Sequence, residues 1–184
     1  AQEANIGEVV VATGDQEIID DVKKNGGNAI LTKNSHKTGT DRIYEALLKF
    51  NNSNIDLIMN LQGDEPLMNV SDIIRLNDLM INNNSQMGTL ASKIFDQRNY
   101  ENENVVKVKT KEILNEFNFP FALDFKRKIL IKNDNLYHHL GIYCYQREIL
   151  KNFVSYNQSL NEVGNNLEQL RALDNGLNIN VALA

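Results

Sequence analysis

The stretch IDLIMNLQGDEP, residues 55–66, joins an apolar run to a polar end. The apolar run over residues 55–61 is too short to cross a membrane and predicts a buried β-strand. The polar end over residues 62–66 places one amide and two carboxylates around a glycine. Because open α/β sheets bind ligands at the carboxyl ends of their strands, the stretch predicts a ligand site that also suits a hard cation. An acidic turn closed by Pro66 is the alternative interpretation.

Strand and helix signals alternate on both sides of this stretch. Strands are predicted at residues 8–13, 28–32, 55–61, 88–95, 105–109, 139–145 and 179–183, with one more inside the weakly periodic residues 115–136. Helices are predicted after the caps Asp15, Thr38 and Ser71, over residues 147–153, and as a longer helix across residues 167–173 that Gly176 closes. The alternation predicts an α/β fold with a mixed, mostly parallel, Rossmann-like sheet and helices on both faces.

The length of 184 residues predicts a single domain over residues 1–184. The chain begins with Ala1 in what resembles the polar end of a helix, and it stops in the strand-like residues 181–184. A strand expected before that first helix would be the central strand of a doubly wound sheet. We therefore expect this domain to be truncated at both ends.

Composition and charge exclude several classes of function. The net charge of −5 and the lack of a dense Lys/Arg run give no support for nucleic-acid binding. No stretch reaches the roughly eighteen apolar residues of a membrane span, and the start lacks the basic and apolar regions of a signal peptide. Cys144 is the single cysteine, which rules out an internal disulfide and favours a cytoplasmic location.

Several motifs follow one another in a specific order: VVVAT, TGTDR, NLQGDEP, VVKV, HLGIYCYQR and LEQLRAL. From residue 8 to residue 184 this series resembles the 3-deoxy-manno-octulosonate (Kdo) cytidylyltransferases, the CMP-Kdo synthetases of nucleotide-sugar transferase-like fold. The resemblance implies that the anomeric hydroxyl of Kdo attacks the α-phosphate of CTP. The products would be CMP-Kdo, used in lipopolysaccharide synthesis, and pyrophosphate. It also implies a homodimer formed through residues 100–136.

The resemblance assigns the metal and part of the sugar-acid site. Asp64 matches the catalytic aspartate that binds Mg²⁺, a cation that prefers hard oxygen ligands. Its partner aspartate belongs to a later segment that this chain does not include. Glu65 is either a neighbour of the metal site or a turn contact. Gln62 matches an amide that contacts Kdo, where an amide can both donate and accept hydrogen bonds.

Arg127, in ALDFKR, aligns with a catalytic arginine of an ALYFSR motif. Its guanidinium would neutralise the Kdo carboxylate in a bidentate pair. Asp124 and Lys126 depart from that motif, and a solvated charge in a basic cluster is the alternative for Arg127.

Further Kdo contacts are expected from two segments. His139 and Tyr143 lie four residues apart on a predicted strand, so their side chains share one face and both can reach one ligand. Glu168 and Gln169 match the LEQLR pair that reaches the sugar hydroxyls. The alternative for that pair is an ordinary solvent-facing position beside a stripe of core leucines.

The nucleotide side of the site is assigned to a helix start. Thr38, Gly39, Thr40 and Arg42 match the SGT(D/E)R loop that binds CTP, and a helix N-terminus offers free amide donors. Arg42 has the alternative role of a surface ion-pair partner. Upstream, Gly14 replaces a frequent aspartate after VAT, and His36 is read as a loop residue near the nucleotide.

Two other functions remain open at this point. A related cytidylyltransferase acting on another sugar acid, such as a nonulosonic acid, would share most of these motifs. A non-catalytic module that binds a nucleotide or a partner would explain why the chain lacks the family's IPAR..S.RLP.KP loop and second metal aspartate. We therefore expect a parent CMP-Kdo synthetase, and little or no CTP turnover by these 184 residues alone.

Overall fold

The computed structural model describes residues 1–63, 68–129 and 134–184. Its strands are β1 (Val10–Thr13), β2 (Asn28–Leu31), β3 (Leu57–Asn60), β4 (Met87–Ser92), β5 (Lys107–Thr110), β6 (Ala122–Lys126), β7 (Leu136–Gln146) and β8 (Ile179–Leu183). Its helices are α1 (Gln16–Lys24), α2 (Gly39–Phe50), α3 (Val70–Asn82), α4 (Arg147–Ser155), α5 (Leu160–Asn165) and α6 (Gln169–Asp174), with short 3-10 helices η1 (Gln2–Ala4) and η2 (Gln97–Tyr100). Within those ranges, no helix is both long and apolar enough to span a membrane.

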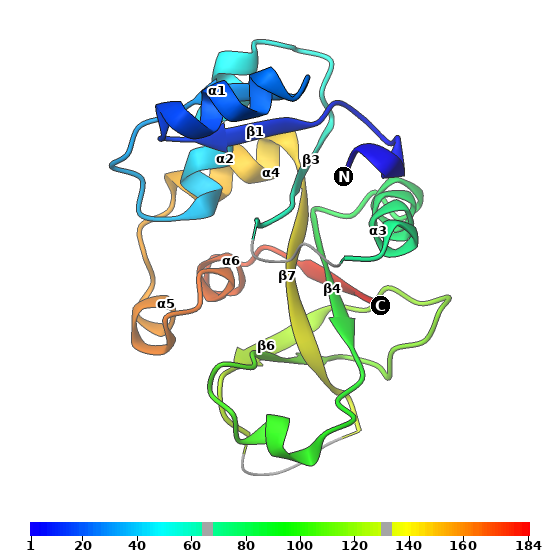
Figure 1. The fold of residues 1–184 in the computed structure, drawn as a ribbon. Helices are drawn as coiled ribbons and strands as arrows, with labels where there is room; N and C mark the ends of the chain where they lie inside the picture. The colour runs from blue at the N-terminus through cyan, green and yellow to red at the C-terminus, as the bar shows by residue number, and fades with distance from the viewer. Residues whose placement is uncertain (64–67, 130–133) are drawn as a thin grey trace.

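The long strand β7 organises the main sheet (Figure 1). The strand order is β6-β5-β7-β4-β8, and β3 pairs with the C-terminal part of β7. The strands β1 and β2 form a separate parallel pair covered by α1 and α2 (Figure 1). The site region described below lies where β3, β7 and the helices α2 and α6 approach one another.

The expected α/β fold class is confirmed, but less of the described pairing is parallel than the sequence predicted. The pairs β1–β2 and β4–β8 are parallel. The strand β7 runs antiparallel to β3, β4 and β5, and β5 runs antiparallel to β6. For β5 and β6 the reason is that residues 111–121, which join them, contain no α-helix, and parallel neighbours need a long crossover connection.

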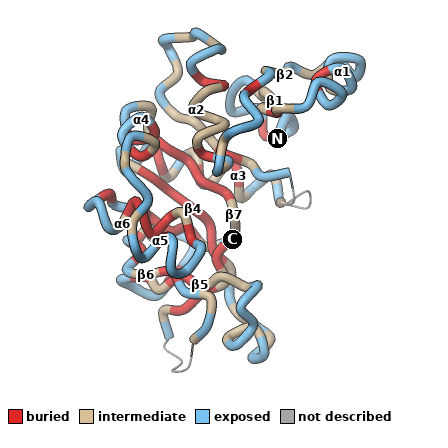
Figure 2. Tube along the Cα trace, turned by 90° about the vertical axis from the view of Figure 1, so that its left-hand side faces the viewer, coloured by how far each residue is buried: buried red, intermediate tan, exposed pale blue. Residues whose placement is uncertain are grey.

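Helices cover both faces of the main sheet, as predicted. The helix α3 packs on one face, where Leu76 and Met80 belong to the same core cluster as Ile142 and Cys144 of β7. The residues that alternate with these along β7, Tyr143 and Tyr145, face the opposite core with α2, α4 and α6. Buried residues concentrate along β4 and β7, whereas α1 is mostly exposed and the β1–β2 pair is mostly intermediate or exposed (Figure 2).

Local signals at the helix ends are partly confirmed. Asp15 caps α1 by accepting a hydrogen bond from the amide of Glu17 at 2.8 Å. The prediction for Ser71 is wrong, because Asn69 takes the extended backbone of the cap and α3 already begins at Val70. The predicted longer helix across residues 167–173 is also wrong: α5 and α6 are separate, and Asn166 between them has a left-handed φ of 52°.

Candidate functional site

A bulge in β7 brings two predicted sugar-acid residues together. Thr89 of β4 is opposite Tyr143, but the next residue, Leu90, is opposite Leu140, so two residues of β7 are inserted between the pairs. On a regular strand, residues four apart are separated by roughly 13 Å. The ring centroids of His139 and Tyr143 are only 5.3 Å apart, which fits the bend that a bulge introduces. The prediction that these two side chains share a face is confirmed.

Gln62 reaches the same part of β7. An ideal Cβ added to Gly141 would lie 3.7 Å from Cδ of Gln62, so the carboxamide rests over this glycine. Gly141 separates His139 from Tyr143 along the strand, and the three predicted Kdo contacts therefore meet at one place. The predicted metal ligand Asp64 and its neighbour Glu65 lie outside the described residues.

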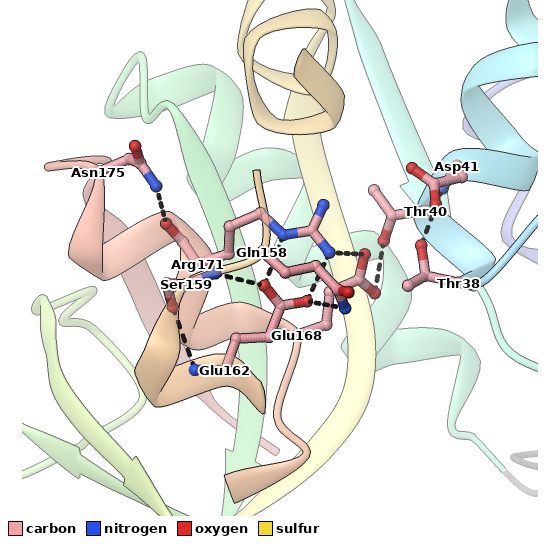
Figure 3. A network of polar contacts seen from close by, with 9 residues as sticks. All are labelled: Thr38, Thr40, Asp41, Gln158, Ser159, Glu162, Glu168, Arg171 and Asn175. Atoms are coloured by element: carbon pink, nitrogen blue, oxygen red, sulfur yellow. Dashed lines mark hydrogen bonds and ion pairs between the residues drawn. The ribbon is translucent and has the colours of Figure 1, made fainter. Parts of the chain in front are cut away.

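The predicted nucleotide loop contacts the predicted sugar-acid helix directly. The hydroxyl of Thr40 donates to Oε2 of Glu168 at 3.0 Å, across 128 positions of sequence (Figure 3). Thr38 caps α2 by accepting from the amide of Asp41 at 3.2 Å. Gln169, at the start of α6, is 7% exposed, which excludes the solvent-facing alternative for that residue. Thr40 itself is 2% exposed, so it lies beneath the protein surface.

A buried ion pair stands behind Glu168, and sequence reasoning missed it. Arg171 donates to both carboxylate oxygens of Glu162, at 2.8 Å from Nε and 2.5 Å from Nη2 (Figure 3). The same Nη2 lies 3.8 Å from Oε1 of Glu168, and the guanidinium stacks on the ring of Phe153 at 5.0 Å. Glu162 also forms a capping box with Ser159. Glu162 and Glu168 thus share the guanidinium of Arg171, whose orientation is fixed by its hydrogen bonds to Glu162 and its stacking on Phe153.

Two polar atoms of this site lack a hydrogen-bond partner within the described part of the chain. They are the hydroxyl of Tyr143 and Oε1 of Glu168, and both are buried. Burial, Tyr145 and Glu168 raise the pKa of Tyr143 well above its usual range, so its hydroxyl remains a donor. Burial also raises the pKa of Glu168, against the opposing effect of Thr38, Thr40 and Arg171. Unpaired buried polar atoms are costly, and a polar ligand would satisfy them.

His139 is neutral in this site. Burial, and to a smaller extent the nearby His138, lowers the pKa of His139 to about 3. Its ring packs edge-on against Phe125 at 5.1 Å and its Nε2 lies 3.0 Å from the hydroxyl of Thr89. A positive imidazolium is therefore not available to pair with a carboxylate at neutral pH.

The other residues predicted on the nucleotide side contact neighbouring loop and strand residues of the chain. Gly39 approaches the carboxamide of Asn60, to which an added Cβ would lie 3.9 Å. Arg42 donates from Nη1 to the hydroxyl of Thr32 at 2.6 Å rather than to a surface carboxylate. The carboxamide of Asn34 fills the space beside Gly14, where an added Cβ would lie 1.8 Å from Oδ1. An aspartate at this position would displace Asn34.

Arg127 lies at a different edge of this region, where it fastens loops. Its Nε and Nη2 donate to the carbonyls of Asn165 and Asn166, both at 2.9 Å. Its Nη1 donates to the carbonyl of Glu103 at 3.1 Å. A guanidinium has further N–H groups on Nη1 and Nη2, so these contacts leave donors for an anion. Arg127 thus reaches the end of α5, which precedes Glu168, and within the described ranges it forms no hydrogen bond or ion pair with the other predicted site residues.

Metal-binding groups are not assembled by the described residues. Across residues 1–63, 68–129 and 134–184, no set of three His, Cys, Asp or Glu side chains is placed to hold a metal ion. Any metal site that includes Asp64 depends on residues outside these ranges.

Sequence signals existed for only some of the missed residues. The pattern Ser159-x-x-Glu162 is a recognisable capping box and indicated a helix start. Arg171 is part of the LEQLR motif, but nothing local indicates that it pairs with Glu162. Thr89 carries no local signal at all, because its partners on β7 lie some fifty positions away in sequence.

Three comparisons place these features among known proteins. The cytidylyltransferase family matches residues 1–179. A 3-deoxy-manno-octulosonate cytidylyltransferase from Thermodesulfovibrio yellowstonii is 44% identical over 188 aligned positions, which cover 97% of this chain and 74% of the relative. A protein of the same name from Bartonella tribocorum is 38% identical, covering 100% of this chain and 75% of the relative.

Solved structures agree in their overall arrangement. The structure of a CMP:2-keto-3-deoxy-manno-octonic acid synthetase complexed with CTP superposes with a TM-score of 0.86 at 32% identity, covering 100% of this chain and 76% of that one. A 4-diphosphocytidyl-2C-methyl-D-erythritol synthase from Anaerococcus prevotii superposes with a TM-score of 0.60 at 15% identity, covering 100% of this chain and 75% of that one. At that identity the second likeness shows the fold alone.

Proposed function

Since this chain belongs to the 3-deoxy-manno-octulosonate cytidylyltransferase family, we propose that it transfers CMP from CTP to Kdo, giving CMP-Kdo and pyrophosphate. The family relationship supports the reaction class, and the names of the relatives support the choice of CTP and Kdo. The further assignment of the product to lipopolysaccharide synthesis is part of the same proposal.

The observation that carries the proposal is the bond between Thr40 and Glu168. A transferase must hold its two substrates against each other, and most of the rate of phosphoryl transfer comes from positioning and charge neutralisation. The helix start proposed for the nucleotide and the helix start proposed for the sugar acid are in direct contact here. A sugar acid over Glu168 and a nucleotide over Thr38–Thr40 would therefore be neighbours.

The residues on the sugar-acid side suit a polyhydroxylated ligand. Gln62 can donate and accept, the unpaired Oε1 of Glu168 can accept, and the unpaired hydroxyl of Tyr143 can donate. Gln169 completes the set at the start of α6. Arg127 would bind the carboxylate with the N–H groups that its loop contacts leave free. Together these contacts would orient the sugar acid for reaction.

Mg²⁺ is proposed as the cofactor, with Asp64 as its ligand. The support is chemical: Asp64 follows β3 closely in the sequence, and its carboxylate is a hard oxygen donor of the kind that Mg²⁺ prefers. When bound, the ion would neutralise charge on the phosphates of CTP. On the nucleotide side, Gly39 and the free amides at the start of α2 would approach CTP, and Arg42 would hold the loop that frames it.

We also propose a homodimer and a cytoplasmic location. The segment expected at the dimer interface exposes large apolar side chains: Ile113 at 60%, Phe117 at 90% and Leu123 at 52%. Exposed apolar surface of this kind favours association. The single cysteine, Cys144, is buried and forms no disulfide, which supports the proposal of a cytoplasmic location. Sedimentation velocity of the chain and of a Phe117→Asp variant tests the interface.

Pyrophosphate release tests the proposed reaction. Purified protein is mixed with CTP and Mg²⁺, and Kdo or a nonulosonic acid is added in parallel reactions, on this chain and on any longer product of the same gene. We expect at least one of these two proteins to release pyrophosphate with Kdo, and this release should require Mg²⁺ and be abolished by Asp64→Asn. Release with the nonulosonic acid alone would identify the related cytidylyltransferase instead. CTP binding by calorimetry without release under any condition would indicate a non-catalytic nucleotide-binding module.

A further inference from the structure

Thr89 occupies the bulge of the β4–β7 pair and is fully buried. Its Oγ1 lies 2.7 Å from the carbonyl oxygen of Ile142 and 3.3 Å from that of Leu140. The same atom lies 3.0 Å from Nε2 of His139. One hydroxyl thus meets two bulge carbonyls and one imidazole nitrogen.

The hydrogen count at this hydroxyl decides the state of the imidazole. A threonine hydroxyl has one hydrogen to donate, whereas a carbonyl oxygen can only accept. The shortest contact, to the carbonyl of Ile142, takes that hydrogen. The contact with His139 is then a hydrogen bond only if Nε2 carries a hydrogen and donates it to Oγ1.

We propose that Thr89 is a positioning residue that holds His139 as the Nε2–H tautomer and leaves Nδ1 as a hydrogen-bond acceptor. The low pKa of His139, about 3, supports a neutral ring in which only one nitrogen carries a hydrogen. For the ligand, this means that the group facing Nδ1 is an O–H or N–H donor and not a carboxylate. The consequence for the ligand rests on the proposed function, but the tautomer does not.

Nitrogen NMR of the unliganded chain tests the tautomer directly. The protein is labelled with ¹⁵N-histidine, and His36→Gln and His138→Gln variants assign the signals of the three histidines. We expect the His139 Nε2 shift to be of the protonated, pyrrole type and the Nδ1 shift of the unprotonated, pyridine type, unchanged between pH 6 and pH 8. The reverse assignment, or a mixture of the two tautomers, would overturn the proposal without reference to any enzyme activity.

Variants at Thr89 separate positioning from folding. Thr89→Val removes the hydroxyl and should move His139 toward a mixed tautomer population, whereas Thr89→Ser keeps the hydroxyl and should restore the wild-type shifts. Circular dichroism checks that both variants fold; if Thr89→Val does not, the wild-type spectrum and Thr89→Ser still decide the question. A folded Thr89→Val with unchanged His139 shifts would contradict the proposed role.

Kinetics then tests the consequence for the ligand. In protein that forms CMP-Kdo, Thr89→Val should raise KM for Kdo about 2- to 10-fold, the value of one hydrogen bond, and leave KM for CTP unchanged. Thr89→Ser should restore KM. An Nε2–H tautomer in protein that has no activity would refute the proposed function and leave the role of Thr89 intact; an unchanged KM for Kdo in an active, mixed-tautomer variant would refute the ligand contact.

Discussion

Two glutamates near α2, Glu45 on the helix itself and Glu168 bonded to its first turn, lie beside cationic partners but have pKa shifts in opposite directions. Glu45 pairs with Lys49 at 2.7 Å and with His36, and these contacts lower its pKa to about 2. Glu168 accepts from Thr40 and lies 3.8 Å from Arg171, yet burial raises its pKa. The ionised form of the carboxyl group is thus stabilised at Glu45 and destabilised at Glu168.

Their own exposure does not explain the difference. The side chain of Glu45 is 14% exposed and that of Glu168 is 28% exposed. The surroundings do explain it: Lys49, which covers Glu45, is itself 49% exposed, whereas Arg171 beside Glu168 is 4% exposed. Water therefore solvates the charges of Glu45 and Lys49, whereas the charge of Arg171 beside Glu168 is shielded from water.

The comparison also distinguishes a surface cluster from a functional site. Both oxygens of Glu45 have partners, so the cluster is complete as it stands. Glu168 keeps one buried oxygen without a hydrogen bond, and the buried hydroxyl of Tyr143 is also unpaired within the described residues. A carboxylate with a raised pKa and an unpaired oxygen, placed inside a predicted site, is typical of a ligand-binding residue.

The largest expected effect comes from breaking the ion pair behind Glu168. Arg171→Met leaves Glu162, which is 3% exposed, without its guanidinium. We expect the free energy of unfolding, measured with urea at pH 7, to fall by about 3 kcal/mol. Burial alone would raise the pKa of Glu162, but the hydrogen bonds and charge of its partners, mainly Arg171, outweigh burial and lower this pKa. The pair therefore stabilises the folded protein above pH 4.5, and this stabilisation is lost as the pH falls below that value.

The double variant Glu162→Gln/Arg171→Met is the matched control. It removes both charges and should recover a large part of the loss, because no unpaired carboxylate is left behind. A single variant as stable as the wild type would show that this pair is solvated like the Glu45 cluster, and the comparison would fail.

An intermediate effect is expected for Glu168→Gln, measured as binding of the sugar acid. The variant keeps the shape but loses the charged acceptor, and KM for Kdo should rise about 10- to 100-fold. Because burial raises the pKa of Glu168 in the folded state, the wild type loses stability as pH rises from 4.5 through that pKa, and the variant should lack this loss. A variant less stable than the wild type at pH 7, with an unchanged KM, would place Glu168 among purely structural residues.

The smallest expected effect is a difference between the pKa values of the two glutamates, measured by titration. In ¹³C NMR of the side-chain carboxyls, we expect Glu45 to titrate near pH 2 and Glu168 above pH 4.5. Sodium chloride at about 0.5 M should raise the pKa of Glu45, whose partners are exposed, and barely change that of Glu168. Glu45→Gln and Glu168→Gln assign the two signals. Two midpoints on the same side of 4.5 would remove the distinction.

Sequence patterns predicted the parts of the site that depend on one segment. The alternation along HLGIYCY correctly placed His139 and Tyr143 on one face, and the cap at Thr38 correctly marked the start of α2. The roles of the predicted residues toward CTP, Kdo and Mg²⁺ remain predictions. Gln62 over Gly141 and Thr40 beside Glu168 could not be predicted as contacts, since each joins segments that are distant in the chain.

The fold shows the same division. Individual strands and most helices were predictable from apolar periodicity, but their pairing was not. Residues 111–121 between β5 and β6 contain no α-helical crossover, so these two strands pair antiparallel, against the mostly parallel sheet that the first half of the chain indicated. Asn166, in the left-handed region, ends α5, and the longer helix predicted across residues 167–173 is limited to the six residues of α6.

By itself the sequence determined the α/β class, the caps at Asp15 and Thr38, and the motifs that identify the family, because each depends on neighbouring residues. Only the tertiary structure decided that Glu168 is an unsatisfied acceptor with a raised pKa while Glu45 is a satisfied one with a lowered pKa. The physical reason is that the energy of a charge depends on the solvent and dipoles around it in space, and these come from elements far apart in the chain.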